Sequence, residues 1–374
     1  MSDNESSPPT PNGAGFLWGG REGGLEAFQA LKIVELTGER SAGALTGRML
    51  TQLGASCERL DIGDATTESI VDDASEQVRA WREELAAMYG AGKRIRQQAQ
   101  LDDLDSLLDG ADIVLLDDMG VRALGGSEKL AMVSSRFPAL ICCQVTGVGE
   151  YDDAGGSRAT EFTIQAAAGV LGTTGHSLQD TVRAGFPVGA TIAALNAISG
   201  ILAALFRRQR TGQGTRIDTT VFDGLFFFLG TFITKWLEAG IEPQPVGNRH
   251  PVIGPWNDYP TADGSVVICI ATDAAWLRLC ELVGTGPERS HLPGWNNNER
   301  VANQDEIDVW ISEWSRTRTS EDVLSQVDQL GVPCSRLRSL AEVLDSEQTR
   351  NRGLIENAAN GARIARLPFR LRRL

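Results

Sequence analysis

The sequence predicts an α/β fold built around a doubly wound parallel sheet. Short apolar runs typical of strands, such as Leu31–Leu36 and Cys57–Asp61, alternate with helical segments through the first half of the chain. Strand, helix, strand at this spacing is a βαβ unit, and its repetition favours a parallel sheet with ligands at the carboxyl ends of its strands. The chain has 374 residues, which is enough for two domains.

The remaining elements of the first half follow the same alternation. A small-residue turn after the first strand leads into a helix that ends at Leu53, and a second helix is expected around Val78–Met88. Further strands are expected at 111–116 and 137–145, with a helix between them.

The longest apolar run, Val188–Phe206, predicts a helix buried on nearly every side. Arginines follow in its last turn, and a Thr-Gly-Gln-Gly turn leads to the strand Arg216–Val221. The run has roughly the 20 residues that cross a bilayer. Because it is rich in alanine and glycine and a strand of soluble type follows at once, we favour a core helix over a membrane span.

Composition narrows the class of protein. The net charge of −14 disfavours binding to the phosphate backbone of nucleic acids. Six cysteines and three histidines show no metal-ligand spacing and no disulfide framework, so no metal is expected. No leader-like segment is recognised at the N-terminus, and we expect a cytoplasmic protein.

Changes in composition predict the domain boundaries. The N-terminal stretch is rich in Ser, Pro, Gly and acidic residues, a Pro-rich linker precedes a hairpin turn at Ala262–Gly264, and the C-terminal stretch is basic. We therefore expect a disordered tail (1–26), a large domain (27–240), a linker (241–260), a smaller α/β domain (261–345) and a C-terminal segment (346–374).

The stretch from Gly185 to Gly224 resembles the family III CoA-transferases of the CaiB/BaiF type. It has a glycine-rich opening, a small-residue helix ending Ile-Leu-Ala-Ala-Leu, a basic turn, and a strand with Asp218 before Phe222-Asp223. Other landmarks of the family follow in order over residues 30–374. The resemblance implies a Rossmann-like large domain, a smaller α/β domain, a C-terminal segment that returns to the large domain, and two chains interlocked like linked rings.

One position departs from the resemblance in a way that bears on the chemistry. In the family a Gly-Asp pair opens the long helix, and its aspartate is the nucleophile; the matching pair here is Gly189-Ala190. A methyl group cannot form the mixed anhydride and CoA thioester on which the family's reaction depends. The usual nucleophile is therefore missing from this chain.

Glu161 is the candidate replacement. It lies in Thr160–Ala166, which resembles the family segment that carries an acidic residue lining the active site. Its side chain is longer than that of aspartate and can bridge a greater distance. The alternative is that it only caps a helix, because acidic residues are common in the first turn.

The resemblance also implies contacts with CoA, the expected substrate that carries the acyl group. The loop and helix start with Arg40, Ala42 and Gly43 correspond to a stretch that touches CoA, although a close-packed turn explains the same residues. The cluster Lys93, Arg94 and Arg96 suits CoA phosphates, and a solvated charged turn is its alternative. Asp117-Asp118 stands where the family has Asn-Phe, which weakens the expectation of a standard CoA pose.

Three functions remain open at this stage. The first is the Asp-lacking subunit of a heteromeric CoA-transferase whose partner supplies the nucleophile. The second is a self-sufficient acyl-CoA enzyme that uses Glu161 as a transferase, hydrolase, isomerase or lyase. The third is an acyl-CoA-binding scaffold without catalysis. Expected partners are an acyl-CoA, a carboxylic acid, and a second chain in an interlocked homodimer or a heterodimer with an Asp-containing homologue.

Overall fold

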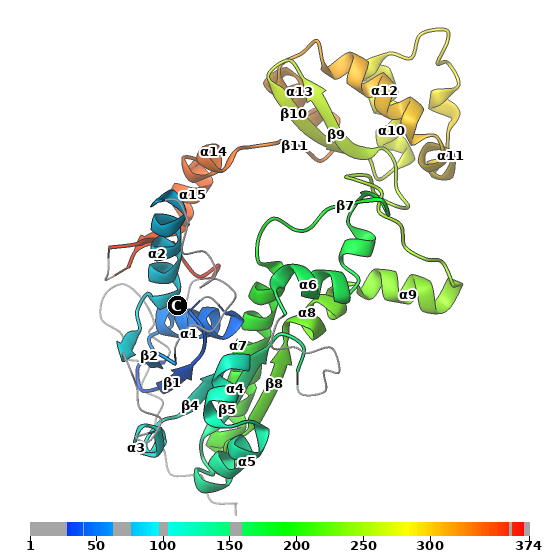
Figure 1. Ribbon diagram of the computed structural model, residues 1–374. Helices are drawn as coiled ribbons and strands as arrows, with labels where there is room; N and C mark the ends of the chain where they lie inside the picture. The colour runs from blue at the N-terminus through cyan, green and yellow to red at the C-terminus, as the bar shows by residue number, and fades with distance from the viewer. Residues whose placement is uncertain are drawn as a thin grey trace, which may run out of the picture. The chain divides into compact units, whose positions relative to one another are not determined.

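The computed structural model describes residues 28–39, 41–62, 76–96, 104–149, 159–358 and 361–369. The chain divides into two compact units (Figure 1). The first unit comprises Met1–Arg158, Ala190–Val221 and Leu354–Leu374, and the second comprises Ala159–Gly189 and Phe222–Gly353. The tail expected over residues 1–26 lies outside the described residues, and the domain boundaries expected from the sequence stay a prediction.

The first unit contains the larger sheet and the helices around it. Its elements are β1 (Lys32–Leu36), α1 (Ala42–Gln52), β2 (Ser56–Leu60), α2 (Glu76–Gly90), β3 (Arg94–Arg96), α3 (Leu104–Leu108), β4 (Ile113–Leu116), α4 (Asp118–Leu124), α5 (Ser127–Arg136), β5 (Ile141–Thr146), most of α7 (Val188–Thr211), β8 (Arg216–Thr220), β12 (Ile355–Asn357) and β13 (Arg363–Ala365).

The second unit is formed mainly by the later part of the chain. Its elements are α6 (Glu161–Ala167), β6 (Gly175–Ser177), β7 (Asp180–Thr181), most of α8 (Val221–Phe228), α9 (Gly230–Ala239), β9 (Trp256–Thr261), β10 (Gly264–Cys269), α10 (Asp273–Val283), α11 (Asn297–Ala302), α12 (Gln304–Ser315), α13 (Ser320–Asp328), β11 (Cys334–Arg336), α14 (Leu340–Leu344) and α15 (Glu347–Arg352), with 3-10 turns at Leu171–Thr173 and Leu292–Gly294.

The described part of the first unit forms a six-stranded sheet in the order β3-β2-β1-β4-β5-β8, with all neighbours parallel. This order, with β1 at the centre and the chain winding outward in both directions, is that of a doubly wound sheet. The predicted α/β fold with a parallel sheet is therefore confirmed.

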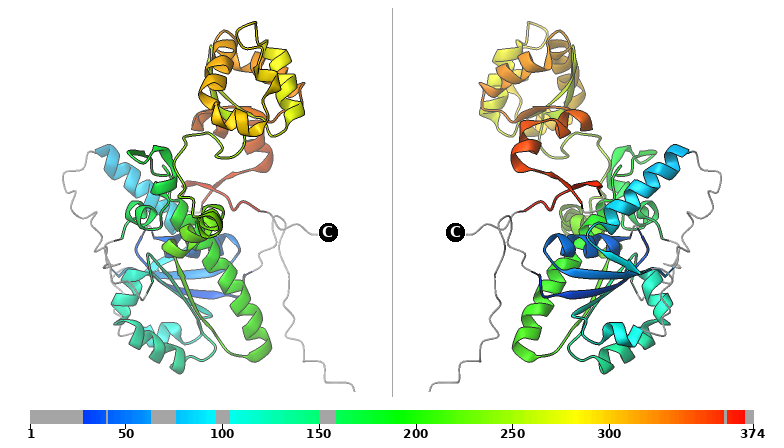
Figure 2. Two further views of the ribbon diagram at one scale, coloured as in Figure 1. Left: turned by 90° about the vertical axis from the view of Figure 1, so that its right-hand side faces the viewer. Right: turned by 90° about the vertical axis from the view of Figure 1, so that its left-hand side faces the viewer.

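Helices cover both faces of this sheet (Figure 2). The side chains of consecutive strand residues alternate between the faces. On β5, Cys142 packs in a cluster with residues of α3 and α5, and its Sγ lies 3.4 Å from Ser134 Oγ of α5. Ile217 pairs with the next residue, Cys143, and packs against Gly200 of α7. The face opposite α5 therefore holds α7.

A buried ion pair links the central strand β1 to the segment just before the edge strand β3. The Lys93 Nζ atom lies 2.8 Å from both carboxylate oxygens of Glu35 on β1 and donates a 2.7 Å hydrogen bond to the Ala44 carbonyl of α1. Both side chains are fully buried. Thr37 Oγ1 and Cys57 Sγ donate to the same carboxylate, so it is hydrogen-bonded by both residues in addition to its ion pair with Lys93.

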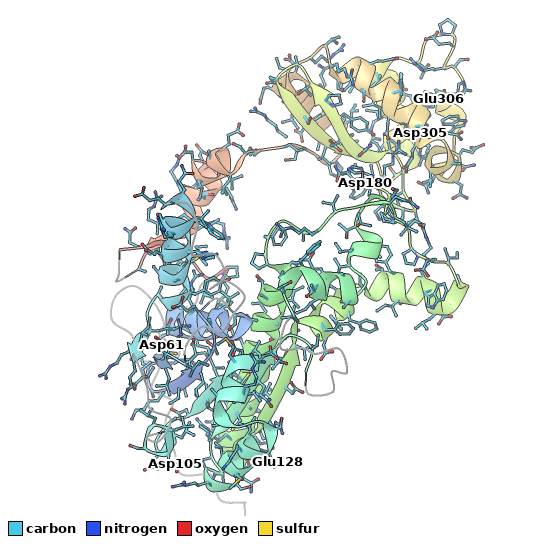
Figure 3. All side chains as sticks on the ribbon, viewed as in Figure 1. Asp61, Asp105, Glu128, Asp180, Asp305 and Glu306 are labelled. Atoms are coloured by element: carbon cyan, nitrogen blue, oxygen red, sulfur yellow. The ribbon has the colours of Figure 1, made fainter. Side chains whose placement is uncertain are left out.

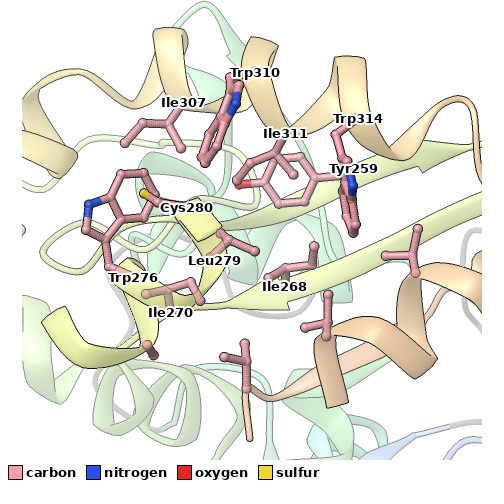
Figure 4. Packing of buried hydrophobic residues seen from close by; sticks show 14 of the residues in the cluster. Tyr259, Ile268, Ile270, Trp276, Leu279, Cys280, Ile307, Trp310, Ile311 and Trp314 are labelled. Carbon is pink, nitrogen blue, oxygen red and sulfur yellow. The ribbon is translucent and has the colours of Figure 1, made fainter. Parts of the chain in front are cut away.

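The core of the second unit lies between a small antiparallel sheet and its helices (Figure 4). Strands β9 and β10 form a hairpin whose turn lies at residues 262–263, as the sequence predicts, and β11 adds on the other side of β10. Trp276 of α10 and Trp310 of α12 meet edge to face, with ring centroids 5.7 Å apart. Edge-to-face packing is a favourable arrangement for two aromatic rings.

Helix α7 is long and apolar enough, by length and composition, to cross a membrane, and 44% of its apolar window is buried. Its buried residues include Ala197 and Ile201, whereas Leu195, Leu202 and Phe206 are exposed, so the prediction of a helix buried on nearly every side is wrong. The strand that follows it, β8, pairs with β5 within the sheet. These contacts are those of a core helix, and the cytoplasmic location stays a prediction.

The Glu35–Lys93 pair leads to a stability prediction. We expect Lys93→Met to lower the free energy of unfolding by about 3–5 kcal/mol, because it leaves a buried carboxylate without its cation. The double variant Glu35→Met/Lys93→Met should recover most of this loss. Urea unfolding followed by tryptophan fluorescence measures both variants. Arg94→Met, at the exposed neighbouring position, is the control and should change stability by about 0.5 kcal/mol or less; equal stability of Lys93→Met and this control would contradict the prediction.

Candidate functional site

The carboxylate of Glu161 lies at the start of α7. Glu161 is in the first turn of α6, and its Oε1 atom accepts a 2.8 Å hydrogen bond from the backbone N–H of Gly189. The first N–H groups of a helix have no partner inside the helix and carry the positive end of its dipole. Gly189 is buried, and Ala190, which directly follows it in α7, is half-buried. A carboxylate therefore lies beside the residue before Ala190, although the chain has no aspartate there.

A second donor comes from α6 itself. Gln165 lies one turn after Glu161, and its Nε2 atom donates a 2.9 Å hydrogen bond to the same Oε1 atom. Glu161 is not needed to cap α6, because Thr160 accepts the hydrogen bond from the Thr163 N–H and forms the capping box. Its contacts with Gly189 and Gln165 therefore give the Glu161 carboxylate a defined position.

A hollow of about 620 Å³ lies in the first unit. Its lining combines the loop after β1, strand β2, the end of α2 and the start of β3. The lining residues are Glu39, Arg59, Ala86, Ala87, Gly90, Gly92, Lys93, Arg94 and Ile95. Small residues at the end of α2 leave this space open, and cationic residues border it.

Arg59 is a buried cation of this hollow, and the sequence analysis missed it. Its side chain is 4% exposed, and its Nη2 atom lies 3.5 Å from Oε1 of the half-exposed Glu39. Within the described part of the chain its Nε atom has no hydrogen-bond partner. A buried guanidinium with an unused donor favours an anionic ligand. The signal available in the sequence is a charged residue within the expected strand Cys57–Asp61, where a buried apolar side chain is usual.

The basic residues predicted at the start of β3 have different environments. The Lys93 ammonium is engaged by Glu35 and Ala44, which differs from the role that the sequence suggested for it. Arg94 is exposed and borders the hollow. Arg96 donates a 2.7 Å hydrogen bond to Glu58 on β2.

The loop after β1 is close-packed where the structure describes it. Arg40 lies outside the described residues. Ala42 and Gly43 are buried in the first turn of α1, whose N-cap is Ser41. A Cβ atom on Gly43 would lie 2.8 Å from Thr37 Cγ2, so this turn tolerates only glycine without rearrangement.

Comparison with known proteins decides the family. Residues 29–374 match the profile of CoA-transferase family III. The chain belongs to this family. It is 26% identical to the succinate–glutarate CoA-transferase of Agrobacterium fabrum over 348 residues. This alignment covers 87% of this chain and 84% of that protein. It is 32% identical to the succinyl-CoA–D-citramalate CoA-transferase of Chloroflexus aurantiacus over 212 residues. This alignment covers 55% of this chain and 52% of that protein.

The fold of the family is also found in a solved structure. A CAIB/BAIF family protein from Brucella suis superimposes with a TM-score of 0.76, and the match covers 92% of both chains. At 24% identity this likeness concerns the fold alone. Family III CoA-transferases take CoA thioesters as substrates, so this chain belongs to a group of proteins that move CoA between carboxylic acids.

The two aspartates at the start of α4 are engaged by the protein backbone. Asp117 is buried, and its oxygens accept hydrogen bonds from the N–H groups of Gly38, Met119 and Gly120. Asp118 Oδ2 accepts from the Gly147 N–H. Burial raises the pKa of both carboxyls above the ordinary value for aspartate. They hold the loops after β1 and β5 in this family III protein.

Other potential nucleophiles and ligands fit less well. Burial raises the pKa of the Cys143 thiol to about 12, and burial followed by Glu35 raises the pKa of Cys57 well above its usual range. The described residues contain no group of three His, Cys, Asp or Glu side chains placed to hold a metal ion. Acidic side chains such as Asp105, Glu128 and Asp305 lie exposed on both units (Figure 3), where they contribute to the net negative charge.

Proposed function

We propose that this chain is a CoA-transferase that moves CoA between two carboxylic acids with Glu161 as the nucleophile. The single observation that carries the proposal is the 2.8 Å hydrogen bond between Glu161 Oε1 and the Gly189 N–H. It puts a carboxylate beside the residue that precedes Ala190, the position where the resemblance expects the aspartate. The family and its relatives supply the reaction class.

The reaction begins when an oxygen of the Glu161 carboxylate attacks the carbonyl carbon of an acyl-CoA thioester. The C–S bond breaks, CoA leaves as a thiolate, and a mixed anhydride forms. The thiolate then attacks the Glu161 carbonyl of the anhydride, which gives a glutamyl-CoA thioester and releases the first carboxylate. A second carboxylate attacks this thioester and displaces the CoA thiolate. The thiolate attacks the new acyl group and restores Glu161.

The backbone N–H of Gly189 supports each of these steps. It is a fixed donor at a helix N-terminus, in a buried position. It holds the Glu161 carboxylate as the attacking anion, stabilises the oxyanion that forms when the Glu161 carbonyl is attacked, and stabilises Glu161 as the leaving group in the last step. The donor needs no rearrangement during the reaction, so its electrostatic effect is preorganised.

The first test is the covalent intermediate. Incubation with a panel of acyl-CoA thioesters, followed by intact-mass analysis, should reveal a CoA-sized adduct on the native chain, and hydroxylamine should displace the CoA and leave a glutamyl hydroxamate. Glu161→Gln should abolish it, because the amide oxygen still accepts from Gly189 but is not a carboxylate nucleophile. Glu128→Gln is the matched control, since Glu128 also lies in the first turn of a helix. An adduct that persists in Glu161→Gln contradicts the assignment of the nucleophile.

The hollow beside β2 is the proposed site for the phosphates of CoA. Arg59 supplies a buried donor with an unused Nε atom, and Arg94 adds an exposed cation at the border. The Lys93 side chain is not assigned to bind phosphate, because its ammonium is paired with Glu35 and stabilises the fold. Guanidinium groups bind phosphate oxygens through paired N–H donors.

Calorimetry with CoA tests this placement. Arg59→Met should weaken the affinity for CoA by about tenfold or more, because a hydrogen bond to a charged group contributes roughly 1.5–3 kcal/mol. Affinity for pantetheine, which lacks the nucleotide phosphates, should be unchanged. Arg136→Met on α5 is the control, since Arg136 pairs with Asp105 and does not line the hollow. An equal loss of affinity for pantetheine would contradict the role of Arg59 in phosphate binding.

A second candidate function is the Asp-lacking subunit of a heteromeric transferase. It is favoured by exposed aromatic side chains on α8, where Phe226, Phe227 and Phe228 are 50%, 79% and 68% exposed. Contiguous apolar surface of this kind marks protein–protein interfaces. We propose that this surface contacts a second family III chain in an interlocked dimer, either a copy of this chain or an Asp-containing homologue.

Native mass spectrometry tests the assembly. The pure chain should run at twice its mass of 40.2 kDa, and Phe227→Asp/Phe228→Asp should shift it to the monomer, because charges on these positions are costly to bury. Phe206 is an exposed aromatic residue on α7, and Phe206→Asp shows whether a charge on a second exposed surface also affects the dimer. A monomer that dimerises only with a co-expressed homologue supports the heteromeric candidate. A monomer under both conditions contradicts the proposed dimer.

A further inference from the structure

We infer that Gln165 is a positioning residue that holds the Glu161 carboxylate and the segment before α7 in one arrangement. This inference rests on the proposed function of Glu161, and it concerns α6 and residues 184–189 of the second unit. The observations that carry it are the burial of Gln165 and the two directions in which its amide is bonded.

Both ends of the Gln165 amide are used. The side chain is completely buried. Its Nε2 atom donates to Glu161 Oε1 at 2.9 Å, and its Oε1 atom accepts from the backbone N–H of Ala184 at 3.1 Å. A buried amide with matched donor and acceptor partners has one preferred orientation, since a flipped amide loses both hydrogen bonds.

Glu161 and Gln165 together bind both ends of the same segment. Gln165 accepts from Ala184, and Glu161 accepts from Gly189. Residues 185–187 between these two anchor points are exposed. The segment is therefore fixed to α6 at its two ends, and the Gln165–Glu161 hydrogen bond couples the anchors.

This coupling has a consequence for reactivity. Loss of the Gln165 donor removes one of the hydrogen bonds that orient the Glu161 carboxylate, so its orientation is less defined. A displacement of about 1 Å at a reacting group can cost roughly a hundredfold in rate. Gln165 is not assigned to contact CoA, so its replacement should slow the chemistry and leave the affinity for CoA unchanged.

Two substitutions separate the two hydrogen bonds. Gln165→Met has similar length and removes both. Gln165→Glu keeps an acceptor for the Ala184 N–H and removes the donor to Glu161. Ile164→Val is the control, because Ile164 is a buried neighbour on α6 whose shortening loosens packing without removing these hydrogen bonds. All three variants are compared with the native chain in the same assays.

The first readout is the rate of adduct formation at saturating acyl-CoA, measured beside the dissociation constant for CoA. Both Gln165 variants should form the adduct about ten- to a hundredfold more slowly with the CoA affinity unchanged, and Ile164→Val should match the native rate. Native rates in both Gln165 variants would overturn the inference. A rate loss shared by Ile164→Val would assign Gln165 a purely structural role and would also overturn it.

The second readout is independent of activity. Trypsin cleaves after arginine, and Arg183 is exposed. The N–H of the Arg183–Ala184 peptide bond is the group that donates to Gln165. Gln165→Met should accelerate cleavage of the Arg183–Ala184 bond, whereas Gln165→Glu and Ile164→Val should leave it near the native rate. Equal cleavage in Gln165→Met and the native chain would overturn the anchoring of this segment.

Glu161→Gln, run in parallel, separates this inference from the proposed function. Persistence of the adduct in Glu161→Gln would defeat both the nucleophile and its positioning by Gln165. Loss of the adduct in Glu161→Gln together with native rates in the Gln165 variants would defeat the inference alone. Loss of the adduct in Glu161→Gln, together with slower adduct formation in both Gln165 variants, would support both the proposed nucleophile and its positioning by Gln165.

Discussion

The buried ion pair between Glu35 and Lys93 is the constraint around which the first unit is arranged. Lys93 precedes β3, Glu35 lies on β1, and the lysine also reaches the carbonyl of Ala44 on α1. A charged pair without exposure is stable only when every donor and acceptor is satisfied, and here the carboxylate has donors from three residues. The positions of α1 and β3 relative to β1 are therefore tightly coupled.

The ion pair also explains why small residues gather around it. A Cβ atom on Gly47 would lie 1.9 Å from Glu35 Oε2, so α1 approaches β1 closely only because this position is glycine. The same pair shapes the neighbouring hollow. The Lys93 ammonium is paired with Glu35, and the other cationic residues of the described lining are Arg59 and Arg94. The basic cluster in the sequence therefore contains a lysine with a structural role and an arginine that borders the hollow.

The sequence predicts the fold better than it predicts the site. Strand β4 and helix α7 were predictable because apolar periodicity is local, and the hairpin at residues 262–263 because Asp-Gly turns have a local preference. The pairing of Lys93 with Glu35 joins residues far apart in the chain, and no local pattern reports it. Glu161 was found through a resemblance, whereas the amide of Gln165 acquires its role only when residues 184–189 lie against α6.

The proposed nucleophile on α6 has different positioning requirements from an aspartate on α7. An aspartate within a helix is oriented by its own backbone. A glutamate that reaches that helix from another element needs additional contacts, because its longer side chain has more rotamers to restrict. The hydrogen bonds from Gly189 and Gln165 supply this restriction, and the second of them is anchored in turn by Ala184. In this chain the chemistry proposed for Glu161 depends on how α6 binds the segment before α7, and residue 190 itself has no chemical part in it.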